Sequence, residues 1–128
     1  MKNLSSSNKK IKIYGPYTPA IRSGNFLFLS GQIPINKKNG KIPEKLSEQT
    51  QLSLKNLLYI LQENKLCINN IIKITIFTTK LEKLDKINKI YSNFFKKYTN
   101  IYPARSCIGV FTLPKNVSIE IEAIASYI

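Results

Sequence analysis

The chain has no histidine among its 128 residues. This absence excludes a Ser-His-Asp or Cys-His nucleophile system, a histidine general base and any imidazole metal site. Cysteine is scarce as well, because Cys67 and Cys107 are the only two and stand too far apart for a CxxC metal or redox motif. Two cysteines do not build a disulfide framework in a chain of this length. We therefore expect reduced thiols and a cytoplasmic protein.

Long apolar runs are also missing. No stretch approaches the ~18 consecutive apolar residues of a membrane helix. Residues 1–10 are rich in Ser, Asn and Lys and lack the apolar stretch of a signal peptide. The length suits one domain, so we expect a single soluble domain over residues 1–128 that begins with a loose polar segment at 1–10 and binds no membrane.

Acidic residues are few: 7 against 20 basic ones, for a net charge of +13 at pH 7. Such a balance is typical of proteins that bind nucleic acid or anionic membranes. However, all the basic residues except Arg22 and Arg105 are lysines, whereas base and phosphate recognition favours the guanidinium fork. Lys, Ile and Asn all have A/T-rich codons, so a biased genome also explains the charge. We favour that explanation over a nucleic-acid partner.

The hydrophobic pattern predicts two amphipathic helices and five strands. Apolar residues recur at helical spacing over 44–64 and 81–98. Strands are expected at 11–14, 26–30, 70–79, 104–112 and 117–127, and the last two resemble a hairpin that turns at 113–116. Two such helices against one mixed sheet make an α+β layer fold. One face of the sheet then stays uncovered by helices and meets either water or other subunits.

The predicted hairpin suggests a site on the uncovered face. If the apolar residues of both strands face the helices, Cys107 lies opposite Glu120 and Arg105 opposite Glu122. One interpretation is an exposed Arg–Glu pair of little consequence. The other is a carboxylate-binding arginine beside a carboxylate that handles protons, and Gly109 in the same strand is typical of close approach by a ligand or backbone.

Four segments in the right order make the chain resemble the RidA (YjgF) family of enamine/imine deaminases, and the resemblance extends from about residue 15 to residue 125. The segments are Gly15-Pro16-Tyr17, Ser30-Gly31-Gln32-Ile33-Pro34, Pro103-Ala104-Arg105-Ser106-Cys107 and Ile119-Glu120-Ile121-Glu122-Ala123-Ile124-Ala125.

This resemblance implies a fold, an assembly and a reaction. The fold is that of bacillary chorismate mutase, one mixed sheet with two helices on one face, in a homotrimer with clefts between subunits. The reaction is hydrolysis of 2-aminoacrylate and related enamines or imines, released by pyridoxal-phosphate-dependent dehydratases, to 2-keto acids and ammonia. Neither a cofactor nor a metal is needed. The enzyme class is a 2-iminobutanoate/2-iminopropanoate deaminase.

The resemblance also assigns two catalytic residues. Arg105 would hold the substrate carboxylate through paired N–H donors. Glu120 would position and activate the attacking water and return its proton to the leaving nitrogen.

Further residues would bind substrate by the same resemblance. Tyr17 would close the cleft, and Ser30 and Gly31 would offer a hydroxyl and a backbone amide. Asn88 matches a pocket residue of the family, although by pattern alone it is a surface amide. Cys107 would line the pocket without acting as a nucleophile, because nothing in the sequence lowers its pKa.

One position departs from the family. Phe111 is expected on the strand 104–112, facing the same way as Arg105, where the family usually carries a small residue, so its ring would narrow the cleft or repack the trimer centre.

Two other functions remain open. One is an RNA-binding or endoribonuclease-type translation inhibitor, favoured by the charge but not by the aromatic residues, which mostly have core spacing. The other is a regulator that binds 2-keto acids without turnover.

Overall fold

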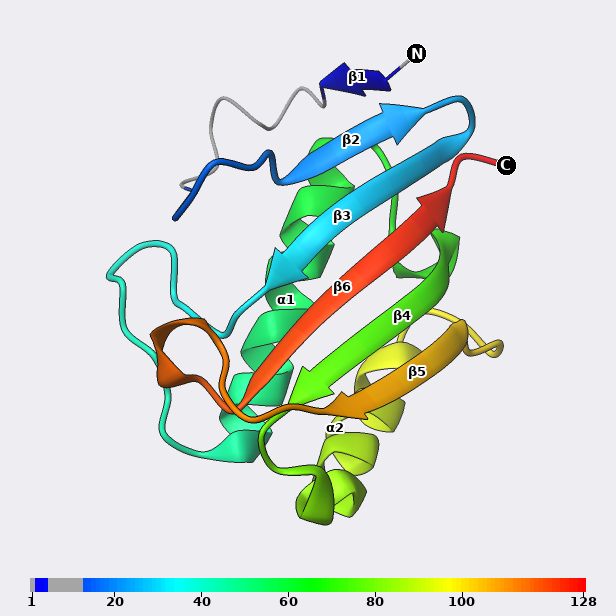
Figure 1. Cartoon of the computed structure of the whole chain (residues 1–128). Coiled ribbons are helices and arrows are strands. Elements are labelled where there is room, and N and C mark those ends of the chain that lie inside the picture. The colour runs from blue at the N-terminus through cyan, green and yellow to red at the C-terminus, as the bar shows by residue number, and fades with distance from the viewer. Residues whose placement is uncertain (1, 5–12) are drawn as a thin grey trace.

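The computed structural model describes residues 2–4 and 13–128. Its helices and strands form one mixed sheet backed by two helices (Figure 1). The strands follow the spatial order β1-β2-β3-β6-β4-β5, and within the described residues only β4 and β5 pair in parallel. The elements are β1 Lys2–Leu4, β2 Ala20–Ser23, β3 Phe26–Gln32, α1 Leu46–Glu63, η2 Ile68–Asn70, β4 Ile71–Thr78, η3 Leu81–Lys83, α2 Leu84–Lys96, β5 Ala104–Gly109, η4 Pro114–Asn116 and β6 Ile119–Ser126.

Both helices pack on the same face of the sheet, behind it in Figure 1. Each presents an apolar stripe at helical spacing, which burial against the strands stabilises. Sheet residues such as Ile74, Ile121 and Ala123 form the other side of this core. The helical core residues are Leu54, Leu57, Ile60, Leu61, Ile87, Tyr91, Phe94 and Phe95. The predicted helices at 44–64 and 81–98 are therefore confirmed, with the first turn of the second one formed by η3.

Within residues 2–4 and 13–128 the opposite face of the sheet carries no helix, as the sequence predicted. Phe28 on β3 pairs with Ile124 on β6, and the Phe28 ring is 45% exposed. Phe26 and Ile108 are exposed on the same face. Below, this surface is called the open face. An apolar strip of this kind is typical of a surface that another protein chain covers.

The N-terminal strands differ from the prediction. A strand was expected at 11–14, but residues 13 and 14 are not in a strand, and 11–12 lie outside the described residues. Residues 2–4, expected to be loose, pair with β2 as strand β1. The sequence reading also missed β2, which turns into β3 through Gly24 and Asn25. Gly24 has φ +60°, the left-handed conformation that such a tight hairpin turn requires.

The predicted C-terminal hairpin is wrong. Strand β4 lies between β5 and β6: it pairs in parallel with β5 on one side and antiparallel with β6 on the other. The connection over residues 110–118 includes η4 and runs past the end of β4 before β6 begins (Figure 1). A connection of this length can cross a neighbouring strand, which a two-to-five-residue hairpin loop cannot.

Candidate functional site

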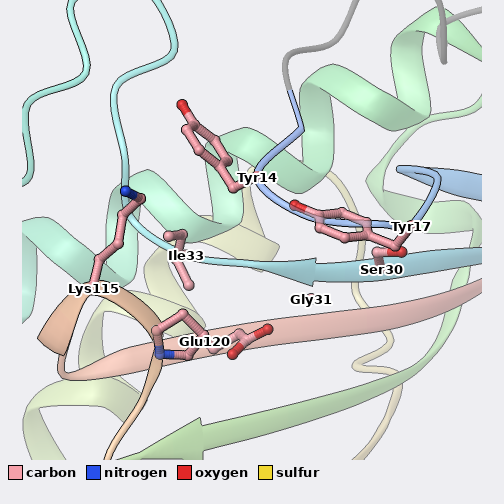
Figure 2. Close-up of a pocket in the computed structure, with 8 residues that line it drawn as sticks. Tyr14, Tyr17, Ser30, Gly31, Ile33, Lys115 and Glu120 are labelled. Atoms are coloured by element: carbon pink, nitrogen blue, oxygen red, sulfur yellow. The ribbon is translucent and has the colours of Figure 1, made fainter.

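A cavity of about 440 Å³ lies where the end of β3 meets the start of β6. We call it the Glu120 cavity. Figure 2 shows that its side chains come from the segment before β2, from the end of β3, from η4 and from β6. The predicted site residues Tyr17, Ser30, Gly31 and Glu120 all line it. The full lining is Tyr14, Tyr17, Ser30, Gly31, Ile33, Pro114, Lys115 and Glu120.

A β-bulge shapes the floor of this cavity. Leu29 pairs with Ala123, but Gln32 pairs with Ile121, so β3 carries one residue more than β6 across this interval. The backbone N–H of Ser30 donates to Pro19 O at 2.9 Å, and its hydroxyl donates to Thr18 O at 2.6 Å. The extra residue lets Ser30 and Gly31 both border the cavity.

Glu120 lies directly against Gly31. A Cβ atom added to Gly31 would overlap the Glu120 carboxylate, whose Cδ would be 2.9 Å away. The carboxylate thus occupies the space that a side chain at position 31 would fill, and the lack of a side chain at Gly31 permits this close approach. Figure 2 shows the two residues on adjoining strands.

The environment of Glu120 favours its protonated form. Desolvation by burial raises the pKa of this carboxyl above its usual value, and the charge of Glu122 raises it further. A carboxylate with a raised pKa is a better proton acceptor near neutral pH than an ordinary surface glutamate. Glu120 is therefore suited to take a proton from water.

Tyr14 and Lys115 line the same cavity, although the sequence reading missed both. The Lys115 ammonium lies 5.2 Å from the centre of the Tyr14 ring, a cation–π distance. Lys115 has φ +56° within η4, a conformation that costs a non-glycine residue about 1 kcal/mol. Tyr14 immediately precedes the Gly15-Pro16-Tyr17 segment, and that adjacency was the available signal.

A second cavity, of about 330 Å³, lies between α2 and the start of β5. We call it the Arg105 cavity. Its lining contains two predicted residues, Arg105 and Asn88, together with Tyr91, Ser92, Tyr102 and Pro103. The Arg105 guanidinium carbon lies 4.8 Å from the centre of the Tyr91 ring, so the face of the ring stabilises the cation by a cation–π interaction. Sequence reading placed Tyr91 only in the apolar face of the second helix, which is correct but incomplete.

Two polar atoms of this cavity are buried without a hydrogen-bond partner in the described part of the chain. Asn88 Oδ1 and the Tyr91 hydroxyl have no hydrogen bond within residues 2–4 and 13–128. Burial raises the pKa of Tyr91 to about 12, against a smaller opposing effect of Arg105, so the hydroxyl is a neutral donor. Buried polar atoms are rarely left unpaired in native proteins. The cavity therefore combines a cation with hydrogen-bonding groups suited to a small polar anion.

The two cavities lie on opposite faces of the sheet. Arg105 pairs with the buried Ile74 of β4 and points toward α2. Glu120 pairs with Phe77 of β4 and points to the open face. Residues that pair across strands share a face. The predicted pairs, Cys107 with Glu120 and Arg105 with Glu122, are therefore wrong, because β5 presents the reverse face from the one expected. The prediction assumed that the apolar Ile108 faces the helices, whereas Ile108 and Ser106 are both exposed on the open face.

Cys107 shares the helix-covered face with Arg105 and packs against the core. Burial raises the pKa of the Cys107 thiol, and this effect outweighs the opposing effect of Arg105. The thiol is thus a poor nucleophile at neutral pH. Its contribution to substrate binding stays a prediction.

Phe111 does not lie where the sequence placed it. Strand β5 ends at Gly109, and the Phe111 ring is 97% exposed in the connection that follows. It therefore narrows neither cavity within this chain.

The described residues contain neither a metal-binding cluster nor a membrane-spanning helix. Residues 2–4 and 13–128 contain no cluster of three or more His, Cys, Asp or Glu side chains able to hold a metal ion. In that same part of the chain, no helix has the length and apolarity needed to cross a bilayer.

Comparison with known proteins gives a consistent result. Residues 7–127 match the family model described as endoribonuclease L-PSP. A RutC family protein of Buchnera aphidicola subsp. Schizaphis graminum is 55% identical over 114 residues, which are 89% of each chain. The 2-iminobutanoate/2-iminopropanoate deaminase of Escherichia coli K12 is 40% identical over 124 residues, covering 97% of this chain and 96% of the relative.

A solved structure extends the likeness to three dimensions. The crystal structure of E. coli TdcF with bound serine superimposes with a TM-score of 0.91 at 39% identity, over 97% of this chain and 98% of that one. Family model, sequence identity and fold agree over nearly the whole length. The chain therefore belongs to the RidA (YjgF) family, the group whose family model is described as endoribonuclease L-PSP.

Proposed function

We propose that the protein is a cytoplasmic deaminase that hydrolyses reactive enamines and imines, such as 2-aminoacrylate, to 2-keto acids and ammonia. Relatives that are 40% identical over almost the full length are named deaminases, which supports the reaction class. The crystal structure of the related TdcF contains bound serine, a molecule of similar size to the proposed substrates that carries the same kind of carboxylate. The observation that carries the proposal is the pair of cavities, one built around Arg105 and the other around Glu120.

We further propose that the two cavities meet between subunits of a homotrimer. Within one chain the sheet separates Arg105 from Glu120, so no small substrate can touch both. The exposed Phe26 and Phe28 on the open face support association, because a neighbouring subunit would bury their rings. Each complete site then contains Glu120 of one subunit and Arg105 of the partner subunit.

The proposed reaction uses these groups in order. The enamine tautomerises to the imine, whose carbon is electrophilic, and Arg105 holds the adjacent carboxylate through paired N–H donors. Glu120 accepts a proton from water as the water oxygen bonds to that carbon. Glu120 passes that proton to the nitrogen, which gives a neutral amino alcohol. It then accepts the proton of the new hydroxyl as the carbonyl forms and delivers it to the nitrogen as the carbon–nitrogen bond breaks, so that a 2-keto acid and ammonia leave. Proximity supplies most of the rate because the imine is already activated.

A coupled assay tests the reaction. A serine or threonine dehydratase generates 2-aminoacrylate or its homologue, and release of the keto acid is followed with and without the protein. We expect faster release with the wild type and none of that acceleration with Arg105→Ala at an unchanged oligomeric state. Equal rates with and without the wild type would overturn the proposal. If Glu120→Gln keeps 2-oxobutanoate affinity but loses turnover, a purely ligand-binding regulator is excluded.

The family description and the charge of +13 favour one second candidate, an RNA-directed activity. It predicts sequence-selective binding or cleavage of RNA that persists at physiological salt. Non-specific adhesion that disappears as salt rises reflects lysine content alone.

A further inference from the structure

The bulge at Ser30–Gly31 reverses the direction of the residue that follows it. Before the bulge, even-numbered residues of β3 such as Phe26 and Phe28 point to the open face. After it, Gln32 points to the opposite side and is only 3% exposed. A polar amide has thus been placed in the interior directly behind the Glu120 cavity. Such an amide is destabilising unless both of its ends are hydrogen-bonded.

Both ends of the Gln32 amide have partners. Its Nε2 donates to the carbonyl of Ser30 at 3.2 Å, and its Oε1 accepts from Lys37 Nζ at 2.9 Å. An ammonium group is a donor only, so it dictates which end of the amide faces it. Lys37 therefore directs the NH₂ group of Gln32 toward Ser30. The opposite orientation would bring two oxygens together at the bulge.

The backbone around Lys37 is itself firmly held. Asn36 N–H donates to Lys41 O at 2.8 Å, and Gly40 N–H donates to Asn36 O at 2.7 Å, which closes a turn around Lys37. On α1, the Asn56 amide donates to the carbonyls of Ile33 and Ile35. Burial lowers the pKa of Lys37. The next residue, Lys38, is exposed, so the two adjacent lysines have distinct environments.

We infer that Gln32 and Lys37 are positioning residues for the deaminase: Lys37 orients the Gln32 amide, which holds the Ser30 carbonyl and thereby the bulge that sets Gly31 against Glu120. The inference rests on the proposed function for its kinetic consequence. Neither side chain lines either cavity. Their effect is therefore on the placement of Glu120 and its water, while the Arg105 cavity stays intact.

The kinetic test compares Lys37→Met with Lys38→Met, which makes the same change one residue later on an exposed side chain. Lys37→Met should lower kcat and kcat/KM about tenfold, the effect of losing one charge-assisted hydrogen bond. Affinity for 2-oxobutanoate should stay within twofold of the wild type, and Lys37→Arg should recover most of the turnover. If Lys37→Met and Lys38→Met have the same kcat, the inference is wrong.

A measurement without turnover separates this inference from the proposed function. The ¹H–¹⁵N resonance of Gly31 should shift in Lys37→Met and stay in place in Lys38→Met. Gln32→Glu keeps the link to Lys37 but removes the donor to Ser30, so it should shift Gly31 as well. An unmoved Gly31 resonance in Lys37→Met overturns the inference whether or not the protein is a deaminase. Absence of deaminase activity together with the expected shifts overturns only the proposed reaction.

Discussion

Arg105 and Glu120 project from opposite faces of one sheet, and strand β4 separates the strands that carry them. The two groups that the proposed reaction needs together are thus kept apart within each chain. The proposed reaction therefore requires a site shared between subunits, and this requirement can be tested directly.

Mixed assemblies should restore activity from two inactive variants. Arg105→Ala supplies an intact Glu120, and Glu120→Gln supplies an intact Arg105. After unfolding and joint refolding at equal amounts, about one site in four should combine both intact groups. We expect about a quarter of the wild-type keto-acid release in the coupled assay.

The control for this mixture is each variant refolded alone, which should stay inactive. A mixture as inactive as its components, despite proven subunit exchange by mass spectrometry, would show that sites do not form between chains.

Two glycine variants should behave in opposite ways. In Gly31→Ala the new methyl group displaces the Glu120 carboxylate, a flexible group, so turnover should fall about a hundredfold with little loss of stability. In Gly24→Ala nothing crowds the methyl group, but φ +60° costs about 1 kcal/mol of stability and turnover should be unchanged. Thermal unfolding and kcat together distinguish the two. Wild-type turnover in Gly31→Ala would contradict the placement of Glu120.

The acid limb of the pH–rate profile should report Glu120. Only its ionised form accepts a proton, so kcat/KM should fall as pH drops through a pKa that lies above the ordinary glutamate value. Glu122→Gln removes the like charge beside it. That change should lower the pKa of Glu120 and move the acid limb to lower pH.

Glu82→Gln makes the same charge change on η3 and serves as the control for that profile. The linkage to stability has a definite sign as well: because the folded-state pKa is raised, stability falls as pH rises from the unfolded pKa through the folded one. Coincident profiles for wild type and Glu122→Gln would remove Glu120 as the titrating base.

Tyr91 should act through its ring. Tyr91→Leu removes the surface beneath the Arg105 guanidinium and should raise KM about fivefold. Tyr91→Phe keeps the ring but removes the hydroxyl donor that the Arg105 cavity offers to an anion, so KM should rise by about twofold, less than in Tyr91→Leu. A rise in KM for Tyr91→Phe equal to that for Tyr91→Leu would instead assign the binding effect to the hydroxyl.

Cys107→Ser should keep its turnover. The raised pKa of the thiol leaves it protonated, so it offers no nucleophile that the reaction could lose. Alkylation by iodoacetamide at neutral pH should modify the exposed Cys67 before Cys107, as read by peptide mass spectrometry. A collapse of kcat in Cys107→Ser with an intact fold would restore covalent catalysis as a possibility.

Local patterns predicted the helices well because their apolar residues repeat over several turns. Leu54, Leu57 and Leu61 on α1 and Ile87, Tyr91 and Phe95 on α2 could hardly face anything but a core. The resemblance placed Tyr17, Ser30, Gly31 and Glu120 at positions that do share one cavity.

The strand pairing could not be predicted in the same way. Strand β5 lies at an edge of the sheet and alternates Arg105 and Cys107 with Ser106 and Ile108, so neither side is clearly apolar and the pattern does not select a face. The bulge was also invisible, because one extra residue in β3 is defined only against its partner β6. Both errors concern contacts between segments that are distant in the sequence.

A sheet that divides the reacting groups has a consequence for how much protein the cell must keep. In the proposed assembly, a chain that dissociates from its neighbours holds only one of the two reacting groups in each of its cavities. The specific activity should then decline on dilution. The total rate of keto-acid release should therefore rise more steeply than in proportion to the amount of protein made.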